Sequence, residues 1–337
     1  MAPDVSVIVV TWNARDHVDP CLQAVLAAGG AGVEAELVVV DNASTDDTAR
    51  HVRDTFPTVR VVETGRNGGM AAGNNAGMLA ADPASRAFLL LNSDAYLHDG
   101  AIATMLERLD DEPAGTVAAV VPALENEDGS PQRSVRGFPT LWRYATELLY
   151  LRRLAPRSRA FNAFYGGGLD LSRPQRIDWA TGACLLVPRD AVDAVGLMDE
   201  AYFMYGEEVD WLRRMAQAGR GVCWEPRATA THLGGGSARS DWGSLYQRQL
   251  ANHVRYMARC ESPRAARRLR RLLVWSMRLR AATWHVAATL VPGSGRSVRR
   301  DRARAFAQGA RTVAAIDPAA VDPPVVPEWP ATGALQR

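Results

Sequence analysis

Short apolar runs alternate with amphipathic segments along the first hundred residues of this chain. The runs are β-rich and four to six residues long, as is typical of buried strands, and they occupy residues 5–10, 37–40, 59–63 and 88–91. Segments with helical spacing follow the first three runs, at residues 17–28, 48–55 and 71–81. Repeated strand–helix units of this length predict an α/β fold, in which one mostly parallel, Rossmann-like sheet is flanked by helices.

The pattern is less regular after residue 94. We expect strands at residues 117–121, 177–187, 222–226 and 228–232, and helices at residues 141–154, 189–195 and within 203–220. Loops are expected at residues 125–139 and 162–174, and an Arg-rich helical pattern runs from residue 242 to about residue 290. The chain therefore divides into an α/β domain at residues 1–240, a basic helical extension at 241–311 and a flexible, proline-rich tail at 312–337.

Polar side chains follow three of the predicted strands at the points where those strands end. Thr11 and Asn13 follow the first strand, Asp41 and Asn42 the second, and Asp94 the fourth. Ligands of open α/β sheets bind at the carboxyl ends of the strands. Short polar groups at three such ends are unusual in a purely structural domain, so we expect a ligand site there.

The sequence Asn92-Ser93-Asp94 is a candidate for binding a divalent cation. Magnesium prefers one or two carboxylates together with substrate phosphates and water. Asp94 can therefore serve when a diphosphate completes the shell, or it can simply open a turn. His232 precedes a glycine-rich segment, where it suits ligation of a metal or phosphate, although a surface histidine fits the same position.

Three carboxylates, those of Glu207, Glu208 and Asp210, lie within four residues at the start of a predicted helix. Acidic residues are common in a first helical turn because they interact favourably with the helix dipole. The dipole accounts less readily for three carboxylates that follow an aromatic cluster and Gly206. Crowded like charges raise one pKa, which suits a general base.

Residues 65–77 follow a predicted strand and open a helix, as a dinucleotide-binding turn does. The glycine pattern is imperfect, however, and Arg and Asn crowd it. A nicotinamide-dependent oxidoreductase would carry its glycines after the first strand, where this chain has Thr11-Trp12-Asn13. The pattern therefore disfavours that class of enzyme.

The net charge of +2 hides an uneven distribution. Between His253 and Arg311 there are 15 Arg and two acids, so this segment carries +13 and the rest of the chain −11. A basic helical segment with interspersed Leu and Trp suits peripheral contact with the inner, anionic face of a cell membrane. Packing on the body of the protein or in a homodimer is the alternative. The segment lacks an aromatic platform or a reading motif, so we expect no nucleic-acid partner.

Neither the start of the chain nor its cysteines indicate secretion. The apolar run at residues 5–10 has no basic region before it, so it does not resemble a signal peptide. The four cysteines are scattered without metal-ligand spacing, which predicts free thiols in a reducing compartment. We expect a cytoplasmic protein.

Taken together, several segments resemble glycosyltransferase family 2, a family of inverting enzymes with the GT-A fold, and most of all its rhamnosyltransferase branch. They occur in the family's order and cover about residues 4–240. The matching segments are VSVIVVTWN at residues 5–13, LVVVDNASTDDT at 37–48, GRNGGMAAGNNAG at 65–77, FLLLNSDA at 88–95, WATGACLLV at 179–187, FMYGEEVDWLR at 203–213 and THLGGGS at 231–237.

The resemblance implies a role for each matching residue. A nucleotide-sugar donor would be bound by Thr11, Asn13, Asp41, Asn42, Arg66, Asn67, Asn75, Asn92 and Ser93. The donor sugar and the acceptor would be bordered by Trp179, Thr181 and Gly182. A Mg²⁺ or Mn²⁺ ion would be held by Asp94 and His232.

One position departs from the family's pattern. The family usually has Glu-Asp where this chain has Glu207-Glu208, and the Asp is the catalytic base. Glu208 takes that position with a side chain longer by one C–C bond, about 1.5 Å. The identity of the base therefore stays open among Glu208, Glu207 and Asp210.

The implied reaction is a single in-line displacement that moves a sugar from a nucleoside diphosphate to an acceptor hydroxyl, in cell-wall or surface polysaccharide assembly. dTDP-rhamnose is the first choice of donor, and a glycan or lipid-linked sugar is the expected acceptor. The alternatives are a UDP-hexose-dependent transferase and a non-catalytic protein of the same fold that binds nucleotide sugars or carbohydrates.

Overall fold

The computed structural model describes residues 2–28, 32–234, 242–291, 293, 295–319, 321 and 323–330. The chain forms two compact units. The sheet unit comprises Met1–Phe138, Leu169–Arg239 and Pro324–Arg337, and the helical unit comprises Pro139–Gly168 and Ser240–Pro323. The helical unit thus includes residues 139–168, which the sequence pattern assigned to the α/β domain.

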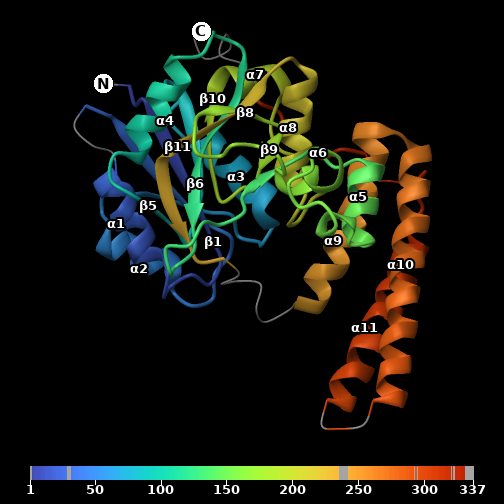
Figure 1. Ribbon diagram of the computed structural model, residues 1–337. Coiled ribbons are helices and arrows are strands. Elements are labelled where there is room, and N and C mark those ends of the chain that lie inside the picture. Colours follow the sequence, from blue (N-terminus) through green and yellow to red (C-terminus); the bar gives the residue numbers. More distant parts are fainter. Residues whose placement is uncertain are drawn as a thin grey trace. The chain divides into compact units, whose positions relative to one another are not determined.

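The sheet unit is built around one large β-sheet (Figure 1). Its described strands lie in the order β3-β2-β1-β4-β10-β6-β11-β5, and β8 pairs with β11. Their bounds are β1 (Val5–Thr11), β2 (Ala35–Asp41), β3 (Arg60–Glu63), β4 (Ala87–Asn92), β5 (Ala95–Leu97), β6 (Val117–Glu125), β8 (Gln175–Ile177), β10 (Cys184–Pro188) and β11 (Gly221–His232). In this described part of the chain, all strands except β5, β8 and β10 run in one direction. The predicted α/β fold with a mostly parallel sheet is confirmed.

Helices cover both faces of this sheet. α1 (Val18–Ala28) and α4 (Ala101–Asp110) share a hydrophobic core with the alternate β1 residues Val5, Val7 and Val9. α3 (Gly69–Ala80) packs on the opposite face, where a Cβ added at Gly77 would lie 2.3 Å from Ile8 Cγ2. Glycine therefore lets this helix approach the central strand closely. The unit also contains α2 (Thr48–Thr55), α7 (Arg189–Val195) and α8 (Glu207–Gln217).

The sequence pattern located β1 to β4 and α1 to α3, and later β6, α5, α7 and α8, but it missed or misplaced several other elements. β5 and α4 follow Asp94, where no element was expected. The strand expected at residues 177–187 is divided among β8, β9 (Trp179–Ala180) and β10, and β9 pairs with β7 (Val135–Arg136) in a separate two-stranded sheet. Residues 222–232, expected as two strands, form the single strand β11 with a register shift between Glu225 and Thr229.

The helical unit is built mainly from three long helices. Its elements are α5 (Leu141–Leu148), η1 (Leu151–Arg153), α6 (Arg159–Asn162), η2 (Ala163–Tyr165), α9 (Trp242–Tyr256), a π-helix (Met257–Glu261), α10 (Pro263–Leu290) and α11 (Arg296–Ala315). α10 and α11 lie side by side as a helical hairpin (Figure 1). On α10, Leu269, Leu273 and Met277 form a buried face. No helix in the described residues is both long enough and apolar enough to cross a membrane.

The end of the chain has defined contacts within the sheet unit. The backbone N–H of Val325 donates to Asp199 Oδ1 at 2.8 Å, and the backbone N–H of Glu200 donates to Val325 O at 2.8 Å. The indole of Trp329 donates to Asp193 Oδ1 at 2.7 Å and meets the ring of Phe88 edge-on at 5.8 Å. A flexible tail was expected at residues 312–337, whereas Val325 and Trp329 are anchored. Residues 235–237 of the THLGGGS segment and residues 331–337 lie outside the described residues.

Candidate active site

The candidate nucleotide residues lie at one edge of the main sheet. In the register of the parallel strands, Thr11 is opposite Asp41, and Val10 is opposite Asn92. The carboxyl ends of β1, β2 and β4 therefore lie level with one another, where the sequence analysis expected a ligand site. Thr11 and Asp41 are buried, and Thr11 Oγ1 lies 3.3 Å from Val40 O and 3.4 Å from Asp41 Oδ1.

Hydrogen bonds join the loops that follow β1 and β2. Asn13 has a left-handed backbone (φ 50°), and its side-chain Oδ1 accepts the backbone N–H of Thr45 at 2.8 Å. Its own N–H donates to Ser44 Oγ at 2.9 Å, while Asp41 Oδ2 accepts the N–H of Ser44 at 3.0 Å. Asn13 and Asp41 thus shape this rim.

Three of the predicted donor residues, Arg66, Asn67 and Asn42, differ in their exposure and in their hydrogen bonds. Arg66 is exposed, and its guanidinium forms no hydrogen bond or ion pair within the described residues. Asn67 Oδ1 accepts the backbone N–H of Gly69, the first residue of α3, at 3.0 Å. Asn42 Nδ2 donates to Gly69 O at 2.9 Å. Of these side chains, that of Arg66 is the one available to an anion from solvent.

Asn75 is buried, and its amide holds the loop that leads to α8. Its Nδ2 donates to Met198 O and to Glu200 Oε1, both at 3.0 Å, and its Oδ1 accepts the N–H of Met198 at 3.0 Å. Both amide hydrogens are therefore used within the protein, while Oδ1 keeps one lone pair. Asn75 positions this loop, and the donor contact that the resemblance implied stays a prediction.

A second contact fixes the same loop on the start of α3. The backbone N–H of Met70 donates to Phe203 O at 2.8 Å. At Gly69, where φ is +83°, an added Cβ would lie 1.9 Å from Phe203 O, so only glycine fits. Two segments far apart in sequence, residues 65–77 and 203–213, therefore form one continuous wall of the site.

Asp94 and His232 lie together, as the sequence analysis predicted. His232 Nε2 is 3.4 Å from Asp94 Oδ1 and 3.5 Å from Asn92 Nδ2. His232 Nδ1 is 2.7 Å from Gln132 Oε1. Because an amide oxygen can only accept a hydrogen bond, Nδ1 must carry the proton. This bond selects the tautomer in which the Nε2 lone pair faces Asp94. Ser93 lies between Asn92 and Asp94, and nothing in the structure gives its side chain a more specific role.

Gln132 is a site residue that the sequence analysis missed. Its Nε2 also donates to His232 O and to Asn126 Oδ1, both at 3.0 Å, so the amide is fixed at both ends. It lies in residues 125–139, which were expected to be a polar loop. A single glutamine in such a loop carries no spacing signal that could have revealed it.

The pair Asp94 and His232 fits a divalent cation. The separation of 3.4 Å is close to the roughly 3 Å between adjacent ligands of an ion with bonds of about 2.1 Å. Histidine metal ligands commonly donate their second ring N–H to a neighbouring acceptor, as His232 does to Gln132. The described residues contain no group of three or more His, Cys, Asp and Glu side chains suited to a metal. Two protein ligands match a site in which a diphosphate supplies the others.

The three acids at the start of α8 meet different surroundings. Asp210 accepts the hydroxyl of Tyr202 at 3.3 Å and forms an ion pair with Arg214 at 3.1 Å. Glu208 Oε2 accepts the backbone N–H of Gly206 at 3.2 Å. Glu207 is buried, and its Oε2 has no hydrogen-bond partner in the described part of the chain.

Burial raises the pKa of both glutamates. Burial is the largest cause of the raised pKa of Glu207, which lies well above its usual range, and the charge of Glu208 adds to it. Burial also raises the pKa of Glu208, but backbone N–H groups and the positive charge of Arg136 oppose the rise. Glu208 is therefore the more easily ionised of the two glutamates. The carboxylate of Asp210 is already paired with Arg214.

Of the three residues that the resemblance implies for the acceptor side, Gly182 lies beside Glu208. A Cβ built on Gly182 would lie 3.5 Å from Glu208 Cβ, so Gly182 packs directly on this side chain. Thr181 donates its N–H to Ser134 O at 3.0 Å, and Trp179 is buried in β9 opposite Arg136 of β7. The break between β9 and β10 brings Gly182 to Glu208, which explains why residues 177–187 do not form one strand.

Tyr205 connects the two groups of acids. Burial raises the pKa of its phenol, and the negative charges of Glu207, Glu208 and Asp94 raise it further. The phenol of Tyr205 therefore lies within electrostatic range of the two α8 glutamates and of Asp94. Tyr205 has a left-handed backbone (φ 67°), which is uncommon for an aromatic residue and typical of functional sites. The sequence analysis noted this aromatic cluster without assigning it a role.

Comparison with known proteins agrees with this geometry. Residues 6–192 match the model of the family described as glycosyl transferase family 2. The chain is 31% identical over 236 residues to the N-acetylglucosaminyl-diphospho-decaprenol L-rhamnosyltransferase of Mycobacterium tuberculosis, which covers 67% of this chain and 75% of that protein. It is 24% identical over 222 residues to the low-salt glycan biosynthesis hexosyltransferase Agl10 of Haloferax volcanii, covering 64% of this chain and 62% of that protein.

A solved structure with a similar fold is the mannosyltransferase PcManGT from Pyrobaculum calidifontis, in complex with GDP-Man and Mn²⁺. The two superpose with a TM-score of 0.53 at 17% identity, covering 93% of this chain and 86% of that one. The fold is therefore GT-A and the class of protein is a glycosyltransferase. This chain belongs to glycosyl transferase family 2.

Proposed function

We propose that this enzyme transfers rhamnose from dTDP-rhamnose to a hydroxyl of a lipid-linked acceptor, with inversion, in the assembly of a cell-wall or surface polysaccharide. The relative from Mycobacterium tuberculosis, whose name gives L-rhamnose as the sugar and a decaprenol-linked diphosphate as the acceptor, supports this choice. The structural observation that carries it is that the phenol of Tyr205 lies within electrostatic range of Glu207, Glu208 and Asp94.

Donor binding is assigned to the level strand ends. Thr11, Asn13 and Asp41 shape the rim around the base and ribose, and Arg66 extends its free guanidinium toward the diphosphate. Guanidinium groups suit phosphate oxygens because of their planar pair of N–H donors. Asn42, Asn67 and Asn75 fix the start of α3 and the loop before α8.

Glu208 is the proposed general base. It packs on Gly182, whose missing side chain leaves room for an acceptor hydroxyl, and its pKa is raised toward neutral pH by burial. It takes the proton of that hydroxyl as the oxygen forms its bond to the anomeric carbon and the bond to the diphosphate breaks. Glu207 titrates together with Glu208 and keeps its proton to higher pH than Glu208 does.

Asp94 and His232 are the proposed ligands of Mg²⁺ or Mn²⁺, oriented by Gln132. A divalent cation bound there would neutralise the charge of the departing diphosphate. The mannosyltransferase structure of similar fold, which contains Mn²⁺, supports the choice of a divalent cation.

A lipid-linked acceptor would bring the enzyme to the inner face of the cell membrane, and we propose peripheral contact there through the Arg-rich helices of the helical unit. A homodimer through the same helices is the alternative. The experiment that tests the donor is transfer from dTDP-rhamnose, UDP-glucose, UDP-galactose and GDP-mannose to a synthetic N-acetylglucosaminyl diphosphate lipid, followed by mass spectrometry. We expect an added deoxyhexose from dTDP-rhamnose alone. An added hexose would mean that the donor is a UDP- or GDP-sugar and not dTDP-rhamnose. Nucleotide binding without any product would favour the non-catalytic alternative.

A further inference from the structure

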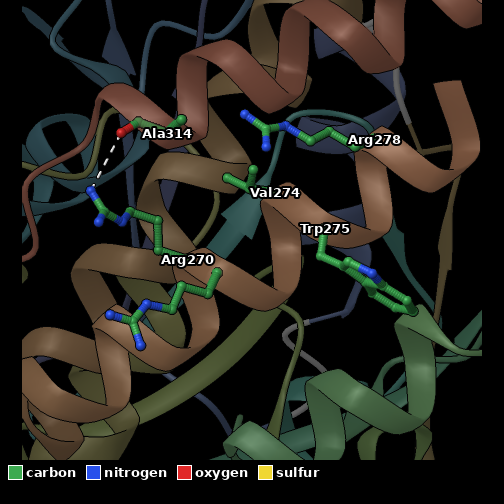
Figure 2. Close-up of a pocket in the computed structure, with 6 residues that line it drawn as sticks. Arg270, Val274, Trp275, Arg278 and Ala314 are labelled. Atoms are coloured by element: carbon green, nitrogen blue, oxygen red, sulfur yellow. Dashed lines mark hydrogen bonds between the residues drawn. The ribbon is translucent and has the colours of Figure 1, made fainter. Parts of the chain in front are cut away.

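A pocket of about 310 Å³ opens on the helical hairpin (Figure 2). It is lined by Arg270, Arg271, Val274, Trp275, Arg278 and Ala314. All of these except Ala314 come from α10, and Ala314 lies on α11. The guanidinium of Arg270 donates to Ala314 O at 3.3 Å and to Ile316 O at 2.8 Å, so it caps the end of α11 and fixes this side of the pocket.

The other two guanidinium groups, those of Arg271 and Arg278, differ from that of Arg270. Arg271 and Arg278 form no hydrogen bond, ion pair or ring contact within the described residues. α10 carries seven Arg and no acid. Two such cations one pocket apart, on a helix that supplies no anion, form a site that is complementary to an external anion. A phosphate group fits both the volume and the charge.

The pocket continues into an exposed apolar stripe on the same helix. Trp275, Leu279, Val286 and Leu290 are each about half exposed or more, and their spacing of four, seven and four residues puts them on one side of α10. This side lies opposite Leu269, Leu273 and Met277, which are buried. A helix that presents Arg and Trp at one end of an exposed stripe and aliphatic residues at the other has the character of an interfacial helix.

We propose that this stripe lies on an anionic phospholipid surface, with one lipid phosphate bound in the pocket by Arg271 and Arg278 beside the indole of Trp275. The proposal rests on the proposed function insofar as a lipid-linked acceptor brings the enzyme to a membrane. Charge complementarity selects the occupant. A second copy of this chain would oppose Arg to Arg at this stripe, and a nucleic acid would leave its aliphatic residues in water.

The test uses full-length protein and sedimentation with vesicles of phosphatidylcholine alone or with 30% phosphatidylglycerol. We expect binding to the anionic vesicles that weakens with salt, because the Debye length falls from about 10 Å at 0.1 M to about 3 Å at 1 M. The double variant Arg271→Gln/Arg278→Gln should lose about 20-fold or more in partitioning, since each Arg at such a surface contributes on the order of 1 kcal/mol. The control, Arg300→Gln/Arg304→Gln on α11, removes the same charge outside the pocket and should lose about threefold or less.

Five outcomes would overturn the proposal. Equal losses in both double variants would mean that overall charge, and not the pocket, binds the surface. Equal binding to neutral vesicles, or no binding to anionic vesicles at 0.1 M salt, would exclude an anionic lipid. Stabilisation by 1 mM inorganic phosphate without vesicle binding would assign the pocket to a soluble anion, and a change of oligomer size in the pocket variant would assign it to a second copy. Transfer to a short-chain, water-soluble acceptor should be unchanged in the pocket variant, so failure of the proposed chemistry is seen separately in the wild-type protein.

Discussion

The two units of this chain treat charged side chains in opposite ways. At the start of α8 in the sheet unit, three carboxylates are crowded, and each meets different neighbours: Arg214 for Asp210, a backbone N–H for Glu208 and none for Glu207 Oε2. On α10 in the helical unit, seven Arg share one helix, and pocket residues such as Arg271 and Arg278 lack any described partner.

The difference follows from solvation. A buried charge is costly unless specific groups stabilise it, so a cluster of buried carboxylates points to chemistry there. An exposed guanidinium is solvated and needs no protein partner, so it stays available to an anion from solvent. Single substitutions among the α8 acids should therefore change the chemistry, and those in the α10 pocket should change binding to an anionic surface.

The largest effect is expected for Glu208→Gln. The variant keeps the size of the side chain but cannot accept a proton, so we expect transfer to fall by about 10³-fold, with the donor dissociation constant within about twofold of wild type. Initial rates and donor titration measure the two quantities. Glu207→Gln is the matched control and should keep at least a tenth of the activity. The reverse result would move the base to Glu207.

The pH profile sharpens the same assignment. The base must be ionised, and burial raises the pKa of Glu208 above that of an exposed glutamate. Activity should therefore rise with pH through this raised pKa, and Glu207→Gln should leave the rise nearly in place, because Glu207 keeps its proton while Glu208 ionises. A profile that is flat from pH 5 to 8 would contradict Glu208 as the base.

The next effect concerns the metal. A nucleoside diphosphate at about 100 times its dissociation constant should stabilise the protein by about 2.7 kcal/mol when Mn²⁺ is present, and much less with a chelator. Asp94→Asn and His232→Ala should each lose most of this difference, because they remove the two candidate ligands. Thermal unfolding provides the measurement. Equal stabilisation with and without Mn²⁺ in the wild type would remove Asp94 and His232 as ligands.

The predictions for Glu208 and Asp94 concern residues that the sequence alone could identify, because the signal for each lies in its own segment. Asp94 and Glu208 each lie at the end of a regular element, and the carboxyl end of a strand or the first turn of a helix can be located from hydrophobic spacing. The four strands with this spacing, β1 to β4, were predicted for the same reason. The mostly parallel order followed from the lengths of the connections.

What the sequence could not give depends on contacts between distant segments. Asn75 resembles a ligand residue in its own segment, and only the position of Met198 shows that its amide holds the loop before α8. Gln132 acquires its role from His232, 100 residues away. The division of residues 177–187 follows from the packing of Gly182 on Glu208, which no periodicity within that segment records.

A smaller effect is expected for Gln132→Leu. Without an acceptor for its Nδ1–H, His232 can turn or change tautomer, and the affinity for Mn²⁺ should fall about 10- to 100-fold. Gln132→Glu keeps the acceptor oxygen and should retain most of the affinity. Gln175→Leu, the same change at a glutamine that bonds Asp170 O, serves as the matched control. The Mn²⁺ concentration for half-maximal activity distinguishes them, since a purely structural role would lower the rate at saturating Mn²⁺ as well.

The stability of Glu207→Gln tests whether the buried charge is truly costly. Because the folded protein raises the pKa of Glu207, its contribution to stability is greatest at low pH and is lost as pH rises above the unfolded value of about 4.3. The variant cannot ionise, so its free energy of unfolding should exceed that of wild type by on the order of 1–2 kcal/mol at pH 8, and the gap should close toward pH 4. Urea unfolding at both pH values measures it, and a gap independent of pH would refute a buried charge.

The smallest effect is expected for Trp329, which follows the basic helices in sequence but belongs to the sheet unit. Residues after the basic helices return to the sheet unit, and Trp329 has specific partners there: Asp193 Oδ1 and the ring of Phe88. Trp329→Ala should weaken the anchor of Val325 on Asp199 and Glu200 by about 1–2 kcal/mol, and so speed exchange of the Glu200 amide hydrogen roughly 5- to 30-fold. Trp142→Ala removes an indole that donates to Ala160 O at 2.7 Å within the helical unit, and should leave this amide unchanged. Because Glu200 also accepts from Asn75, faster exchange in Trp329→Ala would link the end of the chain to the loop that carries the α8 acids; unchanged exchange would leave that loop held by Asn75 and Met70 alone.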